Sequence, residues 1–200
     1  MTKRLGFLEE LRTAERVRRP SVTKRLSAEV RKQVEAVKLL VLDVDGVMTD
    51  GRLYYHDDGT ESKAFDVRDG HGIKMLKQAG IETVLISGRS SPLVEKRAAD
   101  LGIKDVVQGV RDKVPVLEKL LSEKKVGIEE TAYVGDDVVD LPVMNRVRFA
   151  VAVADASEYL FDIAHYVTLA QGGKGAVREV AELILGVQNK WDKVAQVYFE

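Results

Sequence analysis

From residue 39 onward, short apolar runs alternate with amphipathic stretches along the chain. Four runs are apolar at nearly every position, as expected of strands buried on both faces of a sheet: 39–42, 83–86, 131–134 and 149–153. Three other stretches repeat apolar residues about every 3.6 positions, which predicts helices: Val94, Ala98 and Leu101; Val114, Leu117 and Leu121; and Val177, Ala181 and Ile184. This order predicts an α/β fold, a Rossmann-like three-layer sandwich with a central parallel sheet and right-handed crossovers.

One segment interrupts this alternation directly after the first predicted strand. Residues 51–55 and 61–67 are β-prone and flank His56-Asp57-Asp58-Gly59-Thr60, whose Asp-Gly pair is typical of a hairpin turn. We therefore predict a projecting β-hairpin over about residues 51–67. The later connections are too short to hold a cap domain, so a site on this fold is open, or covered by the hairpin or by a neighbouring chain.

The chain begins with a basic arm. Residues 1–38 hold eleven Lys and Arg against five Glu, although the whole chain has a net charge of −1. Apolar residues recur at helical spacing on both sides of Pro20, which predicts two short helices within residues 1–37, ahead of a domain over 38–200 whose tail spans about 171–200. The Glu residues that interrupt the arm and its lack of clustered aromatic residues argue against nucleic-acid binding.

Composition restricts the possible classes further. The chain has 200 residues, of which 45% are hydrophobic and 32% charged, and this excludes collagen-like and wholly disordered proteins. No apolar run approaches the roughly 18 to 20 residues of a membrane span, and the charged N-terminus does not resemble a signal peptide, so we expect a cytoplasmic protein. Because cysteine is absent, disulfides, thiolate zinc sites and cysteine nucleophiles are excluded.

Five carboxylates follow two of the predicted strands. Asp43 and Asp45 come directly after the run 39–42, and Asp136, Asp137 and Asp140 follow 131–134. Since the carboxyl ends of parallel strands meet at one edge of a sheet, these side chains should converge. Two carboxylates about 4 Å apart repel by about 4 kcal/mol at an effective dielectric near 20, so we expect a cation between them. Oxygen ligands without Cys or His favour Mg²⁺, which commonly binds phosphate as well.

Two further segments carry groups suited to phosphate. Ser87, Gly88 and Arg89 end another predicted strand and offer a hydroxyl, a close backbone approach and a guanidinium. Lys113 lies near the start of a predicted helix, two residues before Pro115. A carboxylate nucleophile with a metal, a lysine and a hydroxyl could form and break an aspartyl-phosphate. The alternatives are structural: a helix cap for Ser87 or Asp137, and a solvated helix-start lysine for Lys113.

These motifs, in this order, resemble those of the haloacid dehalogenase-like phosphatase superfamily. A closer similarity is to its small capless members that hydrolyse 3-deoxy-D-manno-octulosonate (KDO) 8-phosphate, and it covers about residues 38–185. The resemblance is carried by 43–51, 63–65, 67–70 and 172–179. It implies a Mg²⁺-dependent phosphomonoesterase of lipopolysaccharide precursor synthesis. Two alternatives remain: a phosphatase of nine-carbon keto-sugar phosphates, or a receiver-type signalling domain that stores the phosphoryl group.

The resemblance also implies a role for each matching residue. Asp43 would be the nucleophile and a metal ligand, and Asp45 the general acid and base, with its backbone carbonyl on the metal. Asp136 would bind Mg²⁺ directly, and the phosphoryl oxygens would be held by Ser87 and Lys113. Asp137 and Asp140 would support the metal and the lysine.

The same resemblance suggests how substrate and subunits are bound. The candidate substrate contacts are Arg68, Gly88, Arg89, Gly172, Gly173, Lys174 and Arg178. In such relatives four subunits associate through their hairpins, and a glycine-rich segment reaches a neighbour's site. We therefore expect a homotetramer, with residues 172–178 contacting the substrate of another subunit.

Overall fold

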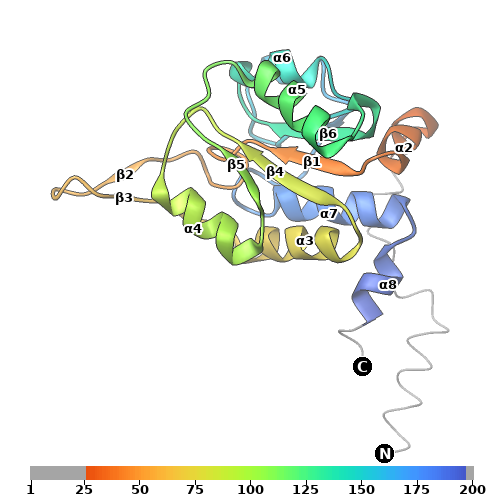
Figure 1. The fold of residues 1–200 in the computed structure, drawn as a ribbon, viewed down its shortest axis with the longest axis horizontal. Coiled ribbons are helices and arrows are strands. Elements are labelled where there is room, and N and C mark those ends of the chain that lie inside the picture. Colours follow the sequence, from red (N-terminus) through yellow and green to blue (C-terminus); the bar gives the residue numbers. More distant parts are fainter. Residues whose placement is uncertain (1–25, 197–200) are drawn as a thin grey trace, which may run out of the picture.

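The computed structural model describes residues 26–196, in which six parallel strands form one sheet (Figure 1). The strand order is β5-β4-β1-β6-β7-β8. The strands are β1 (Leu39–Leu42), β4 (Glu82–Ile86), β5 (Asp105–Val107), β6 (Thr131–Gly135), β7 (Phe149–Ala152) and β8 (Tyr166–Val167). The Rossmann-like α/β fold is therefore confirmed, and all four predicted strands form within one residue of their predicted bounds.

Helices cover both faces of the sheet and bury two separate cores (Figure 1). One face packs against α2 (Ala28–Glu35), α3 (Val67–Gln78), α4 (Pro92–Leu101), α7 (Ala176–Val187) and α8 (Trp191–Ala195). The other face packs against α5 (Lys113–Lys124) and α6 (Leu141–Met144). The short 3₁₀ helices of the described part of the chain are η2 (Ile128–Glu130), η3 (Val138–Asp140) and η4 (Glu158–Leu160). Between residues 26 and 196, each helix is too short or too polar to span a bilayer.

The central strand β1 shows why a fully apolar run becomes a buried parallel strand. Leu40 and Leu42 belong to the core under α7, whereas Leu39 and Val41 belong to the core under α5. All four side chains are fully buried, and β1 pairs with β4 on one side and β6 on the other. A strand with a core on each face has no solvated side, so polar residues begin only where the strand ends.

The projecting hairpin is present but shorter than predicted. Only β2 (Tyr54–Tyr55) and β3 (Glu61–Ser62) pair, in antiparallel register, and the turn between them contains Gly59 at φ +82°. The predicted extension to residue 67 is wrong, because Val67 is the first residue of α3. Asp66 caps this helix by accepting hydrogen bonds from the backbone N–H groups of Arg68 and Asp69, which starts a helix where the β-prone residues suggested a strand.

Both ends of the described chain pack on the domain. The second of the two predicted arm helices is α2, whose Val34 is fully buried in the core that includes α7. The first predicted arm helix lies outside the described residues. The segment that we assigned to the tail contains α7, in which nine of twelve residues are buried.

Candidate active site

Asp43 is the first residue after β1, and the sheet itself fixes its position. Its backbone N–H continues the ladder by donating to the carbonyl of Val134 on β6, at 3.1 Å. Its carboxylate is buried, and Oδ1 accepts the backbone N–H of Val44 at 2.7 Å. Gly46, at φ +90°, then turns the chain. Thr49 is buried within this turn, and its Oγ1 accepts the backbone N–H groups of Gly46 and Gly51, both at 3.3 Å.

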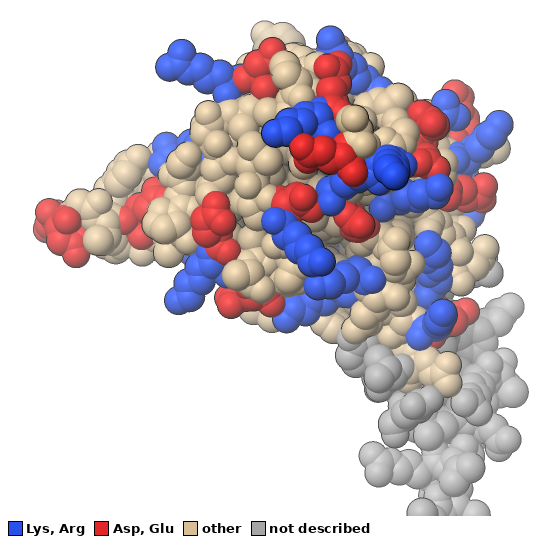
Figure 2. Space-filling view, viewed as in Figure 1, with Lys and Arg blue, Asp and Glu red and all other residues tan. Residues whose placement is uncertain are grey.

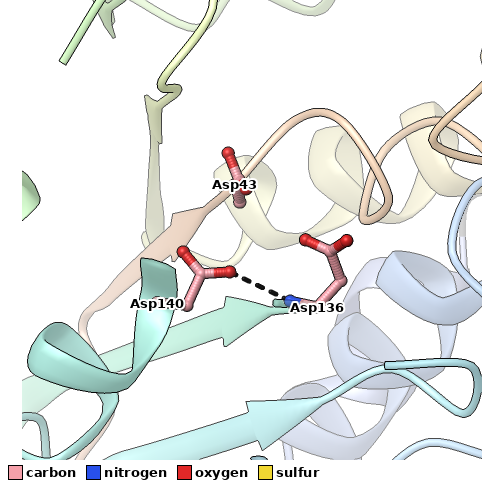
Figure 3. Close-up of side chains that lie close together, drawn as sticks. All are labelled: Asp43, Asp136 and Asp140. Carbon is pink, nitrogen blue, oxygen red and sulfur yellow. Dashed lines mark hydrogen bonds between the residues drawn. The ribbon is translucent and has the colours of Figure 1, made fainter. Parts of the chain in front are cut away.

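Two carboxylates lie beside Asp43: that of Asp136, directly after β6, and that of Asp140, in the η3 turn that follows (Figure 3). Asp43, Asp136 and Asp140 each offer an oxygen, and these three oxygens lie within 4.8 Å of one another. The backbone N–H of Asp136 donates to Oδ2 of Asp140 at 3.0 Å, which fixes the second strand end against the turn that follows it. Gly46 lets the turn after β1 lie close to Asp136, because a Cβ at Gly46 would lie 2.0 Å from Oδ2 of Asp136.

The electrostatics of this cluster match a site for a cation. Burial, with repulsion from Asp140, raises the pKa of Asp43 to about 6. Burial and repulsion from Asp43 and Asp140 raise the pKa of Asp136 to about 8. The carboxylates therefore destabilise one another when all are ionised, and a divalent ion would relieve this repulsion. An all-oxygen donor set of this kind suits Mg²⁺, so the residues fit the expected cofactor.

Lys113 brings a buried positive charge into contact with the cluster. It is the first residue of α5, which Asp112 caps, and it is only 4% exposed. Its Nζ lies 3.0 Å from Oδ1 of Asp43, 2.8 Å from Oδ1 of Asp140 and 3.1 Å from the hydroxyl of Tyr133. Burial lowers the pKa of Lys113, but attraction to the two carboxylates outweighs burial and the pKa is raised overall. The alternative of a solvated helix-start lysine is therefore wrong.

Asp140 and Tyr133 complete the surroundings of this ammonium. Asp140 is fully buried, and its Oδ1 accepts hydrogen bonds from Lys113 and, at 2.6 Å, from the hydroxyl of Tyr133. Asp137 behaves differently, because it is exposed and caps η3 by accepting the backbone N–H of Val138 at 2.7 Å. Asp137 therefore makes the contact of a helix cap, which was the structural alternative for this residue. Asp140, in contrast, contacts Lys113 directly.

The carboxylate of Asp45 faces the hairpin rather than the acidic cluster. It forms an ion pair with Lys63, whose side chain is 1% exposed, and its Oδ2 lies 3.7 Å from Nε of Arg89. Arg89 also pairs with Glu61 on β3, at 3.3 Å. Asp140, and not the side chain of Asp45, is the third member of the cluster with Asp43 and Asp136. The sequence reasoning gave Lys63 no role in the site, although this buried lysine lies within the predicted run 61–67 and directly follows β3.

Ser87 and its neighbours lie at the end of β4, beside β1. Ser87 is buried, and its Oγ accepts the backbone N–H of Arg89 at 3.3 Å. Helix α4 is capped by Ser91 and not by Ser87, because Oγ of Ser91 accepts the N–H of Leu93. The cap alternative for Ser87 is therefore wrong. Gly88 is exposed next to it, and a Cβ there would meet only the carbonyl of Val110 at 3.6 Å.

The glycine-rich segment before α7 packs on its own chain. A Cβ on Gly172 would lie 1.7 Å from the carbonyl oxygen of Gly46, and the N–H of Gly173 donates to the carbonyl of Val47 at 2.9 Å. These two glycines support the turn after Asp43 within the same chain, and their expected contact with a neighbour's site stays a prediction. Their lack of side chains is what lets the two backbones touch.

The remaining candidate substrate contacts lie near this segment and have partners within the chain. Arg68 is 71% exposed and pairs with Asp66 at 3.2 Å. Lys174 donates to Oε1 of Gln171 at 2.7 Å, and Arg178 pairs with Glu182 along α7. A further residue that the sequence reasoning missed is Asp69, which is buried and accepts the backbone N–H groups of Gly175 and Arg178, so that α3 caps α7.

Comparisons with known proteins agree with this geometry. Residues 103–180 match the family model described as haloacid dehalogenase-like hydrolase. The 3-deoxy-D-manno-octulosonate 8-phosphate phosphatase KdsC of Escherichia coli (strain K12) is 48% identical over 168 residues, which cover 84% of this chain and 89% of that protein.

Two solved structures extend this similarity to the fold. The 3-deoxy-D-manno-octulosonate 8-phosphate phosphatase of Yersinia pestis is 47% identical with a TM-score of 0.81, covering 82% of this chain and 89% of that chain. The phosphatase of the same name from Moraxella catarrhalis was solved in complex with magnesium, phosphate and KDO. It is 40% identical with a TM-score of 0.83, and the match covers 85% of this chain and 98% of that chain. This chain therefore belongs to the haloacid dehalogenase-like hydrolases, in the family of the 3-deoxy-D-manno-octulosonate 8-phosphate phosphatases.

Proposed function

We propose that this chain is a Mg²⁺-dependent phosphomonoesterase that hydrolyses KDO 8-phosphate to the free sugar acid and inorganic phosphate. The observation that carries the proposal is the buried carboxylate of Asp43, held at 3.0 Å from Lys113 at the end of the central strand and beside Asp136. The match to the phosphatase of Escherichia coli (strain K12) covers 84% of this chain, and the Moraxella catarrhalis protein was solved with magnesium, phosphate and KDO.

The first half-reaction uses Asp43 as nucleophile. Its carboxylate attacks phosphorus and forms an acyl phosphate, while the bond between phosphorus and the C8 oxygen of the sugar breaks. Asp45 donates a proton to the departing oxygen, which leaves as the C8 hydroxyl. Lys113 neutralises negative charge on the phosphoryl oxygens, and Ser87 donates a hydrogen bond to one of them.

The second half-reaction returns the enzyme to its starting state. Asp45, now ionised, takes a proton from water, and the water oxygen attacks phosphorus of phospho-Asp43. The acyl phosphate bond breaks, so that inorganic phosphate leaves and the carboxylate of Asp43 is restored. Asp43, Asp136 and the backbone carbonyl of Asp45 would hold Mg²⁺, which screens the charge of both carboxylate and phosphate.

Substrate selection is assigned to basic side chains at the rim of the site. Arg89 is 41% exposed and lies 3.7 Å from Oδ2 of Asp45, so it can reach a sugar acid next to the catalytic carboxylates. We assign the substrate carboxylate to Arg89, with Arg68 as a further contact and Gly88 leaving space beside Ser87. Lys174 and Arg178, at the start of α7, are assigned as outer contacts.

We also propose that the chain forms a tetramer through its hairpins and works in the cytoplasm. Large apolar side chains on the hairpin are exposed, with Leu53 and Tyr54 each 42% and Tyr55 67% accessible. Figure 2 shows the hairpin extending from the body, with acidic side chains at its tip and tan surface along much of its length. Apolar surface of this kind commonly marks a contact with another chain. Sedimentation of the parent and of Tyr55→Ser tests the assembly: an unchanged mass would contradict it.

The activity is tested with a panel of sugar phosphates. Phosphate release from KDO 8-phosphate, a nine-carbon keto-sugar phosphate and glucose 6-phosphate is measured with Mg²⁺ and with EDTA. We expect preference for the eight-carbon substrate and dependence on the metal. Asp43→Asn should lower turnover by at least about 1,000-fold, whereas the exposed control Asp100→Asn should not change it. Turnover by Asp43→Asn near the parent rate would rule out the aspartyl-phosphate route, and preference for the nine-carbon substrate would replace the assigned one.

A further inference from the structure

A second polar pocket lies at the edge of the sheet opposite the catalytic carboxylates. Asp43 and Asp136 follow the carboxyl ends of their strands, whereas this pocket is formed by α2 and by the segments that precede β6, β7 and β8. Its volume is about 460 Å³, within the range of small-molecule sites. The residues that carry the argument are Gln33, Glu129, Met144, Arg146, Arg148 and His165.

Gln33 gives this pocket a polar group that the fold leaves unsatisfied. Its side chain lies on α2 and the residue is only 6% exposed. Its Oε1 is buried and accepts no hydrogen bond from the described residues. Buried side-chain oxygens almost always have a donor, so an orphan acceptor on a residue of the pocket wall points to a donor supplied by a bound molecule.

The charges around the pocket indicate an anion. Within residues 26–196, neither Arg146 nor Arg148 forms an ion pair, and Glu129 is the one carboxylate of the lining. The guanidinium of Arg146 is held in place by donating to the carbonyl of Pro142 at 2.6 Å. Two guanidinium groups and one carboxylate give the lining a net positive charge. This charge disfavours a cation and favours a ligand with a carboxylate or a similar oxyanion.

His165 adds a further hydrogen-bond donor to the lining, beside the two arginines. Its Nδ1 accepts the backbone N–H of Ala150 at 3.0 Å, which places the proton of the neutral ring on Nε2. Burial lowers the pKa of His165, and the positive charge of Arg148 lowers it further, while Glu29 opposes them. The ring is therefore neutral near pH 7, with a hydrogen-bond donor on its free nitrogen.

We propose that this pocket binds a small hydroxylated organic anion. The carboxylate of the ligand pairs with the guanidinium groups of Arg146 and Arg148, and a ligand hydroxyl donates to Oε1 of Gln33. A simple fatty acid satisfies the arginines but leaves Gln33 without a donor, whereas a neutral sugar satisfies Gln33 but leaves the arginines unpaired. Sugar acids carry both groups, so they are the chemical class that fits the whole lining.

The probe is D-gluconate, a six-carbon acid with five hydroxyl groups and no phosphate. It is compared with hexanoate, which also has six carbons but carries no hydroxyl group. Binding to the full chain is followed by backbone amide chemical shifts. We expect gluconate to shift the amides of residues 144–148 and 163–165, and to bind at least about 5-fold more tightly than hexanoate.

Three variants separate the parts of the proposed contact. Arg148→Gln should weaken gluconate binding by about 10-fold or more, because it removes a charge-assisted contact. Gln33→Leu should remove the preference for gluconate over hexanoate without weakening hexanoate. The matched control Lys119→Gln changes a lysine that is 77% exposed on α5, and it should bind both probes as the parent does. Arg148 is exposed, so its variant folds irrespective of the packing of Gln33.

The proposal is overturned if gluconate shifts only amides around Asp43, since the anion then binds at the catalytic site alone. It is equally overturned if Arg148→Gln binds gluconate as tightly as the parent, or if gluconate and hexanoate bind alike to the parent chain. Because the readout is binding at named amides, failure of the proposed phosphatase activity would leave this test unaffected.

Discussion

Replacing Lys113 with methionine would separate the charge of this residue from its volume. Lys113 is 4% exposed, and its Nζ lies 3.0 Å from Asp43 and 2.8 Å from Asp140. Methionine fills a similar space but carries no charge, so Asp140 would remain fully buried with only a tyrosine hydroxyl and backbone N–H groups as partners. We therefore expect Lys113→Met to be strongly destabilising as well as inactive.

The expected loss follows from the burial of the partners. Removing one member of a buried ion pair costs about 3–5 kcal/mol, because the other charge stays buried and unpaired. For a chain of this length, each kcal/mol lowers the melting temperature by about 2–4 °C, so the melting temperature should fall by about 6–20 °C. An exposed lysine offers the contrast: Lys119, 77% exposed and 3.8 Å from Glu123, should contribute less than about 0.5 kcal/mol.

The loss should also depend on pH. In the parent, the pKa values of Asp43 and Asp136 are raised above those of the unfolded chain, to about 6 and about 8. The folded state without metal therefore binds more protons than the unfolded state from about pH 4 to about pH 8, and its stability falls as the pH rises through this window. Lys113→Met removes the positive charge that offsets the repulsion between these carboxylates. The stability that Lys113→Met loses relative to the parent should therefore increase toward high pH, where more of the carboxylates are ionised.

Urea unfolding followed by circular dichroism, in EDTA at about pH 5 and about pH 8, measures both effects. Parent, Lys113→Met and the control Lys119→Met are compared at each pH. A free energy of unfolding for Lys113→Met within about 1 kcal/mol of the parent at the higher pH would refute the reasoning. If Lys113→Met loses the same free energy of unfolding at both pH values, Lys113 stabilises the fold through packing and not through its charge.

Three further changes test other contacts of the site. Asp136→Asn removes one of the mutually repelling carboxylates, so in EDTA at about pH 8 it should melt higher than the parent and gain less from added Mg²⁺; equal gains would contradict a metal site at Asp136. Gly172→Ala would place a Cβ 1.7 Å from the carbonyl oxygen of Gly46, so we expect a loss of about 1–3 kcal/mol and slower phosphate release, and parental melting would contradict the packing. Tyr133→Phe removes a 2.6 Å hydrogen bond to Asp140 and should cost about 1–2 kcal/mol in urea unfolding, less than the loss of Lys113.

The strands that the sequence predicts are those with a core on both faces. Residues 39–42 have no polar position, and all four side chains are fully buried. The missed strand β5 has three half-buried residues, pairs with only one neighbour and includes Asp105, which bonds to Lys124. An edge strand with one neighbour needs no apolar run, so its pattern does not differ from that of a loop.

The convergence of acidic residues was predictable because parallel strands end at one edge of a sheet. That rule brings Asp43 and Asp136 together without any knowledge of the intervening chain. Contacts that depend on side-chain packing were not predictable. The ion pair of Lys63 with Asp45 requires the exact path of the hairpin, and the contact of Gly172 with Gly46 joins residues far apart in the sequence. Neither leaves a periodic signal in the chain.

The hydrogen bonds of the backbone explain how an acidic cluster can be kept in place at all. Asp43 is anchored by a ladder bond to Val134, and Asp136 by its N–H to Asp140, so the two strand ends are fixed by bonds that involve no metal. The apolar cores on both faces of β1 and β6 supply the stability that the clustered charges reduce. Metal binding therefore changes the charge of a site whose backbone is already assembled. It follows that EDTA should lower the melting temperature without unfolding the chain, and that activity should return as fast as Mg²⁺ can bind.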